Sequence, residues 1–178
     1  MPSLQSLRRK IAAFKNTQKI TKAMKMVAAA KLKRAQDRIL AARPYALKMR
    51  GVLSNLSQRV NRSSHPLLQK REGKKVEVLV VTSDRGLCGG FNGNIVRKSS
   101  EFVRQCEAQG SQVNLSIVGR KGRDYFRRRT WPIRQEWTGI FDKLTFEHAI
   151  DIGGDLTDHF VKGTFDELHI VYNEFKSA

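Results

Sequence analysis

The stretch whose residue types could do chemistry is a glycine-rich segment, S-D-R-G-L-C-G-G-F-N, at residues 83–92. Loops of this kind bind phosphate groups when they follow a strand and have the spacing G-x-G-x-x-G. Here Cys88 stands where the first glycine of that pattern belongs, and no Lys-Ser or Lys-Thr pair follows as a P-loop requires. We therefore expect a tight turn whose glycines permit a positive φ or close packing, with nucleotide binding as the weaker alternative.

Cys88 is also a candidate nucleophile, because Arg85 and a nearby helix N-terminus would activate its thiol. No histidine lies close to it in sequence to act as a base, so catalysis is not predicted, and Asp84 and Arg85 are expected to make a surface contact. Cys88 and Cys106 are too few for a disulfide framework or a zinc site, which indicates a reducing compartment. The histidines show no metal-ligand spacing: His65, His148, His159 and His169. We predict no catalytic residue, cofactor or metal.

The elements that must position this segment alternate between strands and helices. Residues 76–82 read V-E-V-L-V-V-T, a β-branched run typical of a buried parallel strand. A helix over residues 95–108 follows, and Gly110 is placed to end it. The remaining expected elements are a strand at 113–118, a basic helix at 119–129, an edge strand within 131–137, a helix at 144–161 that Gly153 and Gly154 could interrupt, and a last buried strand at 167–172. This order predicts an α/β fold, a Rossmann-like open sheet with right-handed crossovers.

The first sixty residues carry a different pattern, an apolar heptad repeat. Its positions advance by alternating threes and fours and read Leu4, Leu7, Ile11, Phe14, Gln18, Thr21, Lys25, Ala28, Leu32, Ala35, Ile39, Ala42, Ala46, Met49, Leu53, Leu56 and Val60. We call these positions the seam. They predict one long coiled-coil helix over residues 1–60, roughly 85 Å in length, that needs a partner helix. Pro44 is expected to kink or break it near residues 41–43. A linker or unstable loop at 61–75 and the Rossmann-like domain at 76–178 would follow.

Charge is concentrated on the same stretch. Residues 1–60 hold 15 Lys and Arg against Asp37 alone, which places +14 of the total net charge of +18 there. Such a surface attracts acidic partners and disfavours self-pairing. Nucleic acid, an anionic membrane surface and an acidic protein could each supply the opposite charge. Few aromatic residues are available to stack on bases, and the alanines of the seam are poor membrane anchors, so an acidic protein is favoured. A basic coiled coil that binds nucleic acid is the alternative.

Three motifs resemble the gamma subunit of F-type ATP synthase. They are K-N-T-Q-K-I-T-K-A-M-K-M-V-A-A-A-K-L-K-R at residues 15–34, A-R-P-Y at 42–45, and the glycine-rich segment at 83–92. The resemblance implies a central stalk whose N-terminal helix pairs with a long C-terminal helix inside a hexamer of alpha and beta subunits. That C-terminal helix is missing after Ala178. The α/β domain would lie against the epsilon subunit and the membrane c-ring, with no nucleic acid bound and the ATP chemistry on the beta subunits.

The resemblance also implies a location and two contact regions. The chain lacks the cysteine-bearing insertion of the chloroplast form, which favours a bacterial enzyme, peripheral on the cytoplasmic face of the inner membrane. Five residues would lie near the acidic loop of the beta subunits: Lys19, Lys22, Met24, Lys25 and Met26. Gln18, Thr21 and Lys25 interrupt the apolar seam at the same level, which is consistent with looser helix pairing there. Arg85 and Cys88 would face another stalk component, such as the epsilon subunit.

Overall fold

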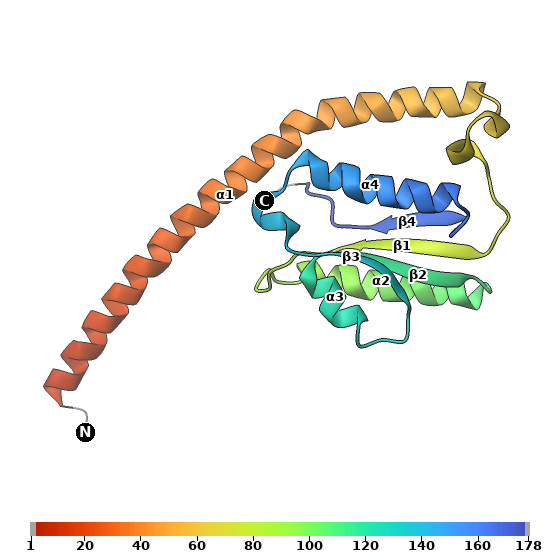
Figure 1. Ribbon diagram of the computed structural model, residues 1–178. Coiled ribbons are helices and arrows are strands. Elements are labelled where there is room, and N and C mark those ends of the chain that lie inside the picture. The colour runs from red at the N-terminus through yellow and green to blue at the C-terminus, as the bar shows by residue number, and fades with distance from the viewer. Residues whose placement is uncertain (1–2, 177–178) are drawn as a thin grey trace. The chain divides into compact units, whose positions relative to one another are not determined.

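The computed structural model describes residues 3–176, apart from the side chain of Arg62. The chain divides into two compact units, one that reaches Val60 and one that starts at Asn61. The first unit is one long helix, and the second is a sheet with helices packed against it (Figure 1). The predicted fold class, a Rossmann-like α/β domain preceded by a long helix, is therefore confirmed. The finer division that treats residues 61–75 as a separate linker stays a prediction.

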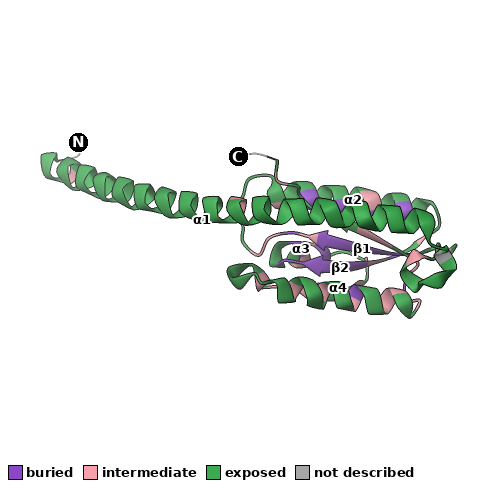
Figure 2. Ribbon diagram, turned by 90° about the horizontal axis from the view of Figure 1, so that it is seen from above, coloured by how far each residue is buried: buried purple, intermediate pink, exposed green. Residues whose placement is uncertain are grey.

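The first unit is α1, which runs from Leu4 to Arg59. Ser3 caps its first turn, since its hydroxyl accepts a hydrogen bond from the backbone N–H of Ser6 at 3.3 Å. No residue of α1 is buried (Figure 2), and the seam is open to solvent throughout. The helix as described therefore lacks the apolar packing that supplies most helical stability in proteins. Within residues 3–176, no helix has both the length and the hydropathy that crossing a bilayer demands.

Pro44 lies inside α1 without ending it. Figure 1 shows the ribbon bending in its orange stretch and continuing as helix. A break near residues 41–43, one of the two expectations, is thus wrong. A bend leaves the backbone carbonyl four residues before the proline open to water, so the proline removes a hydrogen bond without ending the helix.

Residues 61–74 lie between α1 and the first strand. They contain two short 3-10 helices, η1 (Arg62–Ser64) and η2 (Pro66–Leu68). Arg71 then donates hydrogen bonds to the backbone carbonyls of Phe160 and Phe165, and its guanidinium lies 4.2 Å from the centre of the Phe160 ring. A distant part of the second unit therefore contacts Arg71, and the linker or unstable loop at 61–75 stays a prediction.

The sheet has four parallel strands in the order β3-β2-β1-β4. Their bounds are β1 Lys75–Val81, β2 Gln112–Val118, β3 Ile133–Trp137 and β4 Glu167–Val171. The central strands are apolar and buried as predicted, with Val78 and Leu115 fully inaccessible. β3 lies at one edge, as Pro132 suggested. β4 was expected to be buried but forms the other edge, where Ile170 is 53% exposed.

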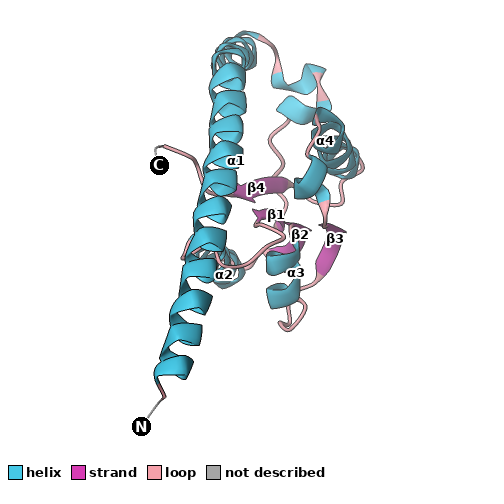
Figure 3. Ribbon diagram, turned by 90° about the vertical axis from the view of Figure 1, so that its left-hand side faces the viewer, coloured by secondary structure: helices cyan, strands magenta, loops and turns pink. Residues whose placement is uncertain are grey.

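Helices cover both faces of the sheet (Figures 1 and 3). α2 (Phe91–Ala108) and α3 (Arg120–Phe126) pack on one face, where Val103 and Phe126 are fully buried. α4 (Phe146–Val161) packs on the other face through Leu156. A short 3-10 helix, η3 (Ile140–Lys143), precedes α4. The sheet is therefore the middle layer of a three-layer sandwich, and its apolar side chains supply both cores.

Two helix boundaries differ from expectation. α2 starts at Phe91 rather than residue 95, so Gly93 lies inside it, while Gly110 follows its end with φ +81° as predicted. α4 continues through Gly153 and Gly154. Burial of Leu156 holds that helix on the sheet, and this outweighs the cost of about 1 kcal/mol that each glycine imposes on a helix.

A charged cluster lies between the sheet and α4. Glu77 of β1 is fully buried, and its Oε1 is 3.0 Å from Nε of Arg134 on β3. Arg134 also donates to Asp155 of α4 at 2.7 Å and to Ser116 of β2 at 2.9 Å, and Ser116 in turn donates to Glu77. Burial alone would lower the pKa of Arg134, but Asp155 and Glu77 raise it overall. This cluster ties three strands to α4, and the sequence patterns did not reveal it.

Candidate functional site

The basic stretch of α1 at residues 19–26 is the first candidate contact surface. Lys19, Lys22, Lys25 and Met26 lie within one side of the helix, because successive residues turn by about 100°. Met24 falls on a different side, so the structure brings together four of the five predicted residues and separates the fifth. Met24 is 65% exposed and Met26 is 62% exposed, so both could contact a partner without rearrangement.

The helix around this stretch offers little internal compensation for its positive charge. The acidic residue of α1, Asp37, forms an ion pair with Lys33 at 3.1 Å, one turn away along the helix. At the polar part of the seam, the Thr21 hydroxyl donates to the backbone carbonyls of Thr17 and Gln18. Thr21 is therefore satisfied by its own helix. The Lys and Arg surface remains available to an acidic partner.

The glycine-rich segment forms a loop after β1 at residues 82–90. This loop lies where the order of the strands in the sheet changes direction. The chain first adds β2 and β3 on one side of β1 and then adds β4 on the other side. The carboxylate of Asp84 accepts hydrogen bonds from the backbone N–H groups of Arg120 at 2.9 Å and Gly139 at 3.0 Å. Burial would raise the pKa of Asp84, but hydrogen bonds from Gly139, Arg120 and Phe141 lower it overall. Asp84 thus ties the loop to the starts of α3 and η3.

Asn92 and Arg85 hold the rest of the loop. Asn92 Oδ1 accepts from the backbone N–H of Ser83 at 3.0 Å, and its Nδ2 donates to the Arg85 carbonyl at 3.2 Å. The Arg85 guanidinium forms an ion pair with Asp142 at 2.5 Å. The Cys88 sulfur lies 3.1 Å from Asn92 Nδ2. Arg85 and Cys88 are therefore near each other on one exposed loop, as their closeness in sequence suggested.

Leu87 is a contact candidate that the sequence reading missed. Its φ is +57°, a left-handed conformation that costs a residue with a Cβ about 1 kcal/mol or more, and its side chain is fully exposed. The sequence did offer a signal for this contact, because Leu87 is an apolar residue between two glycines of an otherwise polar turn. An apolar side chain held outward at the tip of an anchored loop can bury itself in a partner.

The candidate nucleophile and the histidines contact other groups. Cys88 contacts Asn92 and the Arg85 carbonyl. The histidines contact other groups, with His159 hydrogen-bonded to the Asp155 carbonyl and His169 close to Glu167. In the part of the chain that the structure describes, no three His, Cys, Asp or Glu side chains gather as metal ligands would. The surfaces described above are exposed and can make protein contacts.

Comparison with known proteins places the chain in a family. The profile of the ATP synthase family, ATP-synt, matches residues 3–178. The ATP synthase gamma chain of Anaeromyxobacter sp. (strain Fw109-5) is 46% identical over all of this chain. The gamma chain of Pelotomaculum thermopropionicum is 43% identical over 98% of it. The chain belongs to the ATP synthase gamma family. It spans 62% and 61% of the length of these two relatives.

Two chains from solved mitochondrial ATP synthases share the fold. The central stalk of the Tetrahymena thermophila mitochondrial ATP synthase, solved with its c-ring, has a TM-score of 0.68 and 28% identity. That alignment covers 89% of this chain and 66% of the other. A chain of the Euglena gracilis mitochondrial ATP synthase has a TM-score of 0.55 at 20% identity, covering 96% and 52% of the two chains, and supports the fold alone. The resemblance drawn from residues 15–34, 42–45 and 83–92 is thus confirmed. Nothing in these comparisons supports the nucleic-acid-binding alternative.

Proposed function

We propose that this chain acts as the central-stalk subunit of a proton-translocating F-type ATP synthase. In that role it couples rotation of the membrane c-ring to conformational change at the catalytic beta subunits. The observation that carries the proposal is α1, a helix of 56 residues with no buried residue, an exposed apolar seam and a coat of Lys and Arg. Membership of the gamma family and likeness to a stalk solved with its c-ring support it.

The exposed seam of α1 indicates that a second helix packs against it. Phe14 is 72% exposed and Leu53 is 58% exposed, and such side chains gain stability when a partner helix covers them. Ala28, Ala35 and Ala42 lie between these residues, so the partner could approach closely. We infer that the partner is the long C-terminal helix of the same subunit, and that the pair forms a rod stiff enough to transmit torque.

The rod would act by presenting a different side to each catalytic subunit as it turns. A rotor of this kind can shift the binding equilibria of three sites in sequence only if its contacts with them differ. Lys19, Lys22, Lys25 and Met26 form one such side, near the acidic loop of the beta subunits, while Met24 would contact a different neighbour. The chain itself is non-catalytic in this proposal, and the alpha and beta hexamer carries the ATP chemistry.

The loop at residues 82–90 would contact a second stalk component, the epsilon subunit. Arg85, Leu87 and Cys88 are exposed on it, while Asp84 and Asn92 fix its backbone. A fixed loop loses little conformational entropy on binding, which favours its use as a contact. The assembled subunit would lie peripherally on the cytoplasmic face of a bacterial inner membrane.

Co-purification tests the partner assignment. The 178-residue chain, co-expressed with tagged alpha and beta subunits, should be recovered with the hexamer in stoichiometric amount. Recovery without the hexamer but with nucleic acid that salt releases would contradict the proposal, because salt displaces proteins from phosphate backbones. A photocrosslinker attached at Cys88 should capture epsilon in the complete enzyme, and capture of no neighbour would contradict that contact alone.

Charge reversal tests the rotor surface. In the complete enzyme, Lys22→Glu combined with Lys25→Glu should weaken the coupling of ATP hydrolysis to proton pumping, because it replaces attraction to an acidic loop by repulsion. The matched control reverses Lys31 and Lys48, two exposed lysines of α1 outside the 19–26 stretch. Coupling that stays unchanged in the first variant, or falls equally in both, would refute a specific role for this surface.

A further inference from the structure

A cleft lies between α2 and α3, next to the anchored loop at 82–90. Its volume is about 550 Å³, and its lining includes Val96, Ser100, Arg104, Lys121 and Tyr125. Gly93 lies at its wall, where an added Cβ would meet nothing within 4 Å. The cleft is therefore open enough to admit a small molecule, and its walls combine apolar side chains with cationic ones.

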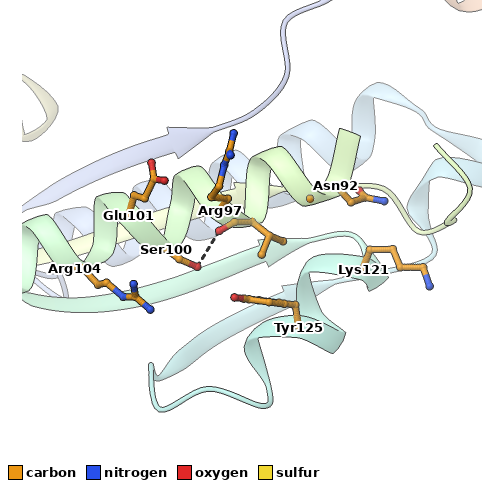
Figure 4. A pocket seen from close by; sticks show the side chains of 9 residues that line it. Asn92, Arg97, Ser100, Glu101, Arg104, Lys121 and Tyr125 are labelled. Atoms are coloured by element: carbon orange, nitrogen blue, oxygen red, sulfur yellow. Dashed lines mark hydrogen bonds between the residues drawn. The ribbon is translucent and has the colours of Figure 1, made fainter. Parts of the chain in front are cut away.

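The polar groups gather at one end of the cleft. Figure 4 shows Arg104 and Ser100 extending from α2 on the side where the Tyr125 hydroxyl points from α3. Arg129, which follows α3, contacts that hydroxyl, since its Nη2 donates to Tyr125 Oη at 3.2 Å and its Cζ lies 4.7 Å from the ring centre. One guanidinium thus lines the cleft, and a second contacts the hydroxyl of a tyrosine that lines it.

No carboxylate neutralises this end of the cleft. Neither Arg104 nor Arg129 forms an ion pair within residues 3–176. Glu101 also lines the cleft, but Figure 4 shows its side chain directed away from Tyr125, and its carboxylate lies 4.0 Å from the Lys98 amine. The positive charge is therefore left for something else to balance.

The ionisation of Tyr125 responds to that charge. Burial would raise the pKa of Tyr125, but hydrogen bonds with Ser100 and Arg129 and the charges of Arg129 and Arg104 lower it overall. The phenol thus experiences a positive potential. The hydroxyl is also placed to donate a hydrogen bond to an anion that enters between the two guanidinium groups.

We propose that the α2–α3 cleft binds the phosphate group of a small phosphate ester, with Arg104 and Arg129 pairing its oxygens and the Tyr125 hydroxyl donating a third hydrogen bond. Guanidinium groups match phosphate oxygens in a bidentate geometry, and two of them balance a group that carries close to two negative charges at neutral pH. The organic part of the ester would lie along Val96 and the Tyr125 ring. The residues assigned to phosphate differ from those assigned to partner contacts on α1 and on the loop at 82–90.

Tyrosine NMR on the whole chain gives a direct test. The protein has three tyrosines, and labelling their ring Cζ with ¹³C lets each ionisation be followed, with Tyr125→Phe assigning its signal. Millimolar phenyl phosphate or inorganic phosphate should raise the pKa of Tyr125, because a bound anion opposes formation of the phenolate. Tyr45 and Tyr172 should not respond. Sodium chloride at matched ionic strength is the control for screening. No shift at Tyr125, or equal shifts at all three, would overturn the proposal.

A pair of arginine variants tests the assignment of the site. Arg104→Gln should weaken phenyl phosphate binding by about tenfold, which is the loss of one charge-assisted contact. Arg97→Gln, two turns earlier on α2, is the matched control. Arg97 also lines the cleft, but Figure 4 shows its side chain directed away from Tyr125, so binding by this variant should stay within about twofold of the parent. Equal binding by the two variants would overturn the assignment. Tighter binding of phenyl phosphate than of inorganic phosphate would identify an ester as the preferred source of the group.

Discussion

The buried charge cluster offers the sharpest test of how the second unit is held together. Replacing Arg134 by methionine keeps most of the side-chain volume but removes the cation that pairs with Glu77 at 3.0 Å and with Asp155 at 2.7 Å. Glu77 is fully inaccessible and cannot turn toward water, whereas Asp155 is partly exposed and can be hydrated. Arg134→Met should therefore lower the free energy of unfolding chiefly because it leaves the Glu77 carboxylate buried without a cationic partner.

The expected magnitude follows from that burial. Removing one partner of a buried ion pair costs about 3–5 kcal/mol, because the remaining charge loses its compensation. Adding Glu77→Gln to Arg134→Met removes that charge and should restore about 1–2 kcal/mol. As a control, Arg127→Met breaks a bidentate pair with Glu136 at the surface, where solvent screens the charges, so stability should change little.

Urea unfolding followed by tryptophan fluorescence measures these values. Trp131 lies just before the strand that carries Arg134, and Trp137 is the last residue of that strand. Because α1 contains no tryptophan, the signal reports the second unit. For a slope of about 2 kcal/mol per molar urea, Arg134→Met should lower the midpoint by roughly 2 M. A midpoint shift below about 0.5 M, or a double variant less stable than Arg134→Met, would refute the reasoning.

Four further predictions concern individual residues. Gly119→Ala should destabilise the second unit by more than about 1 kcal/mol in urea unfolding, because φ is +98° and the new Cβ would lie 2.3 Å from the Thr82 carbonyl oxygen. Gly51→Ala, with nothing within 4 Å, should instead stabilise α1 by about 1 kcal/mol, measurable as greater helicity by circular dichroism. A thiol reagent at neutral pH should modify exposed Cys88 quickly and buried Cys106 only on unfolding. Burial is the largest cause that raises the pKa of Cys106, and the charges of Glu167 and Glu107 raise it further. The stabilisation that comes from the raised pKa of this thiol should therefore persist at neutral pH and be lost as the pH rises above the ordinary thiol range. A stabilised Gly119→Ala, unchanged helicity in Gly51→Ala or equal thiol rates would contradict these respective arguments.

The repeating patterns of the sequence predicted the main elements because each pattern reflects a local geometry. Alternating steps of three and four placed apolar residues along one side of a helix, and the structure has that helix over 56 residues. The β-branched run at residues 76–82 predicted a buried strand, and β1 is central and inaccessible. The start of α2 at Phe91 was misjudged, and of the two expectations at Pro44 the break was wrong. Local propensity does not report which backbone groups find partners or water elsewhere.

What the sequence by itself determined is the periodicity, the charge distribution and the family. These quantities can be counted along the chain, and they give a basic helix with an uncovered apolar seam followed by an α/β unit. What only the tertiary structure decided is which distant side chains meet. Glu77, Arg134 and Asp155 form one cluster although 78 positions separate the first from the last. Arg104 and Tyr125 line one cleft, and Arg129 hydrogen-bonds the Tyr125 hydroxyl. Parallel strands and the helices between them bring such residues together through crossover connections, and no pattern within a few turns of the chain carries that information.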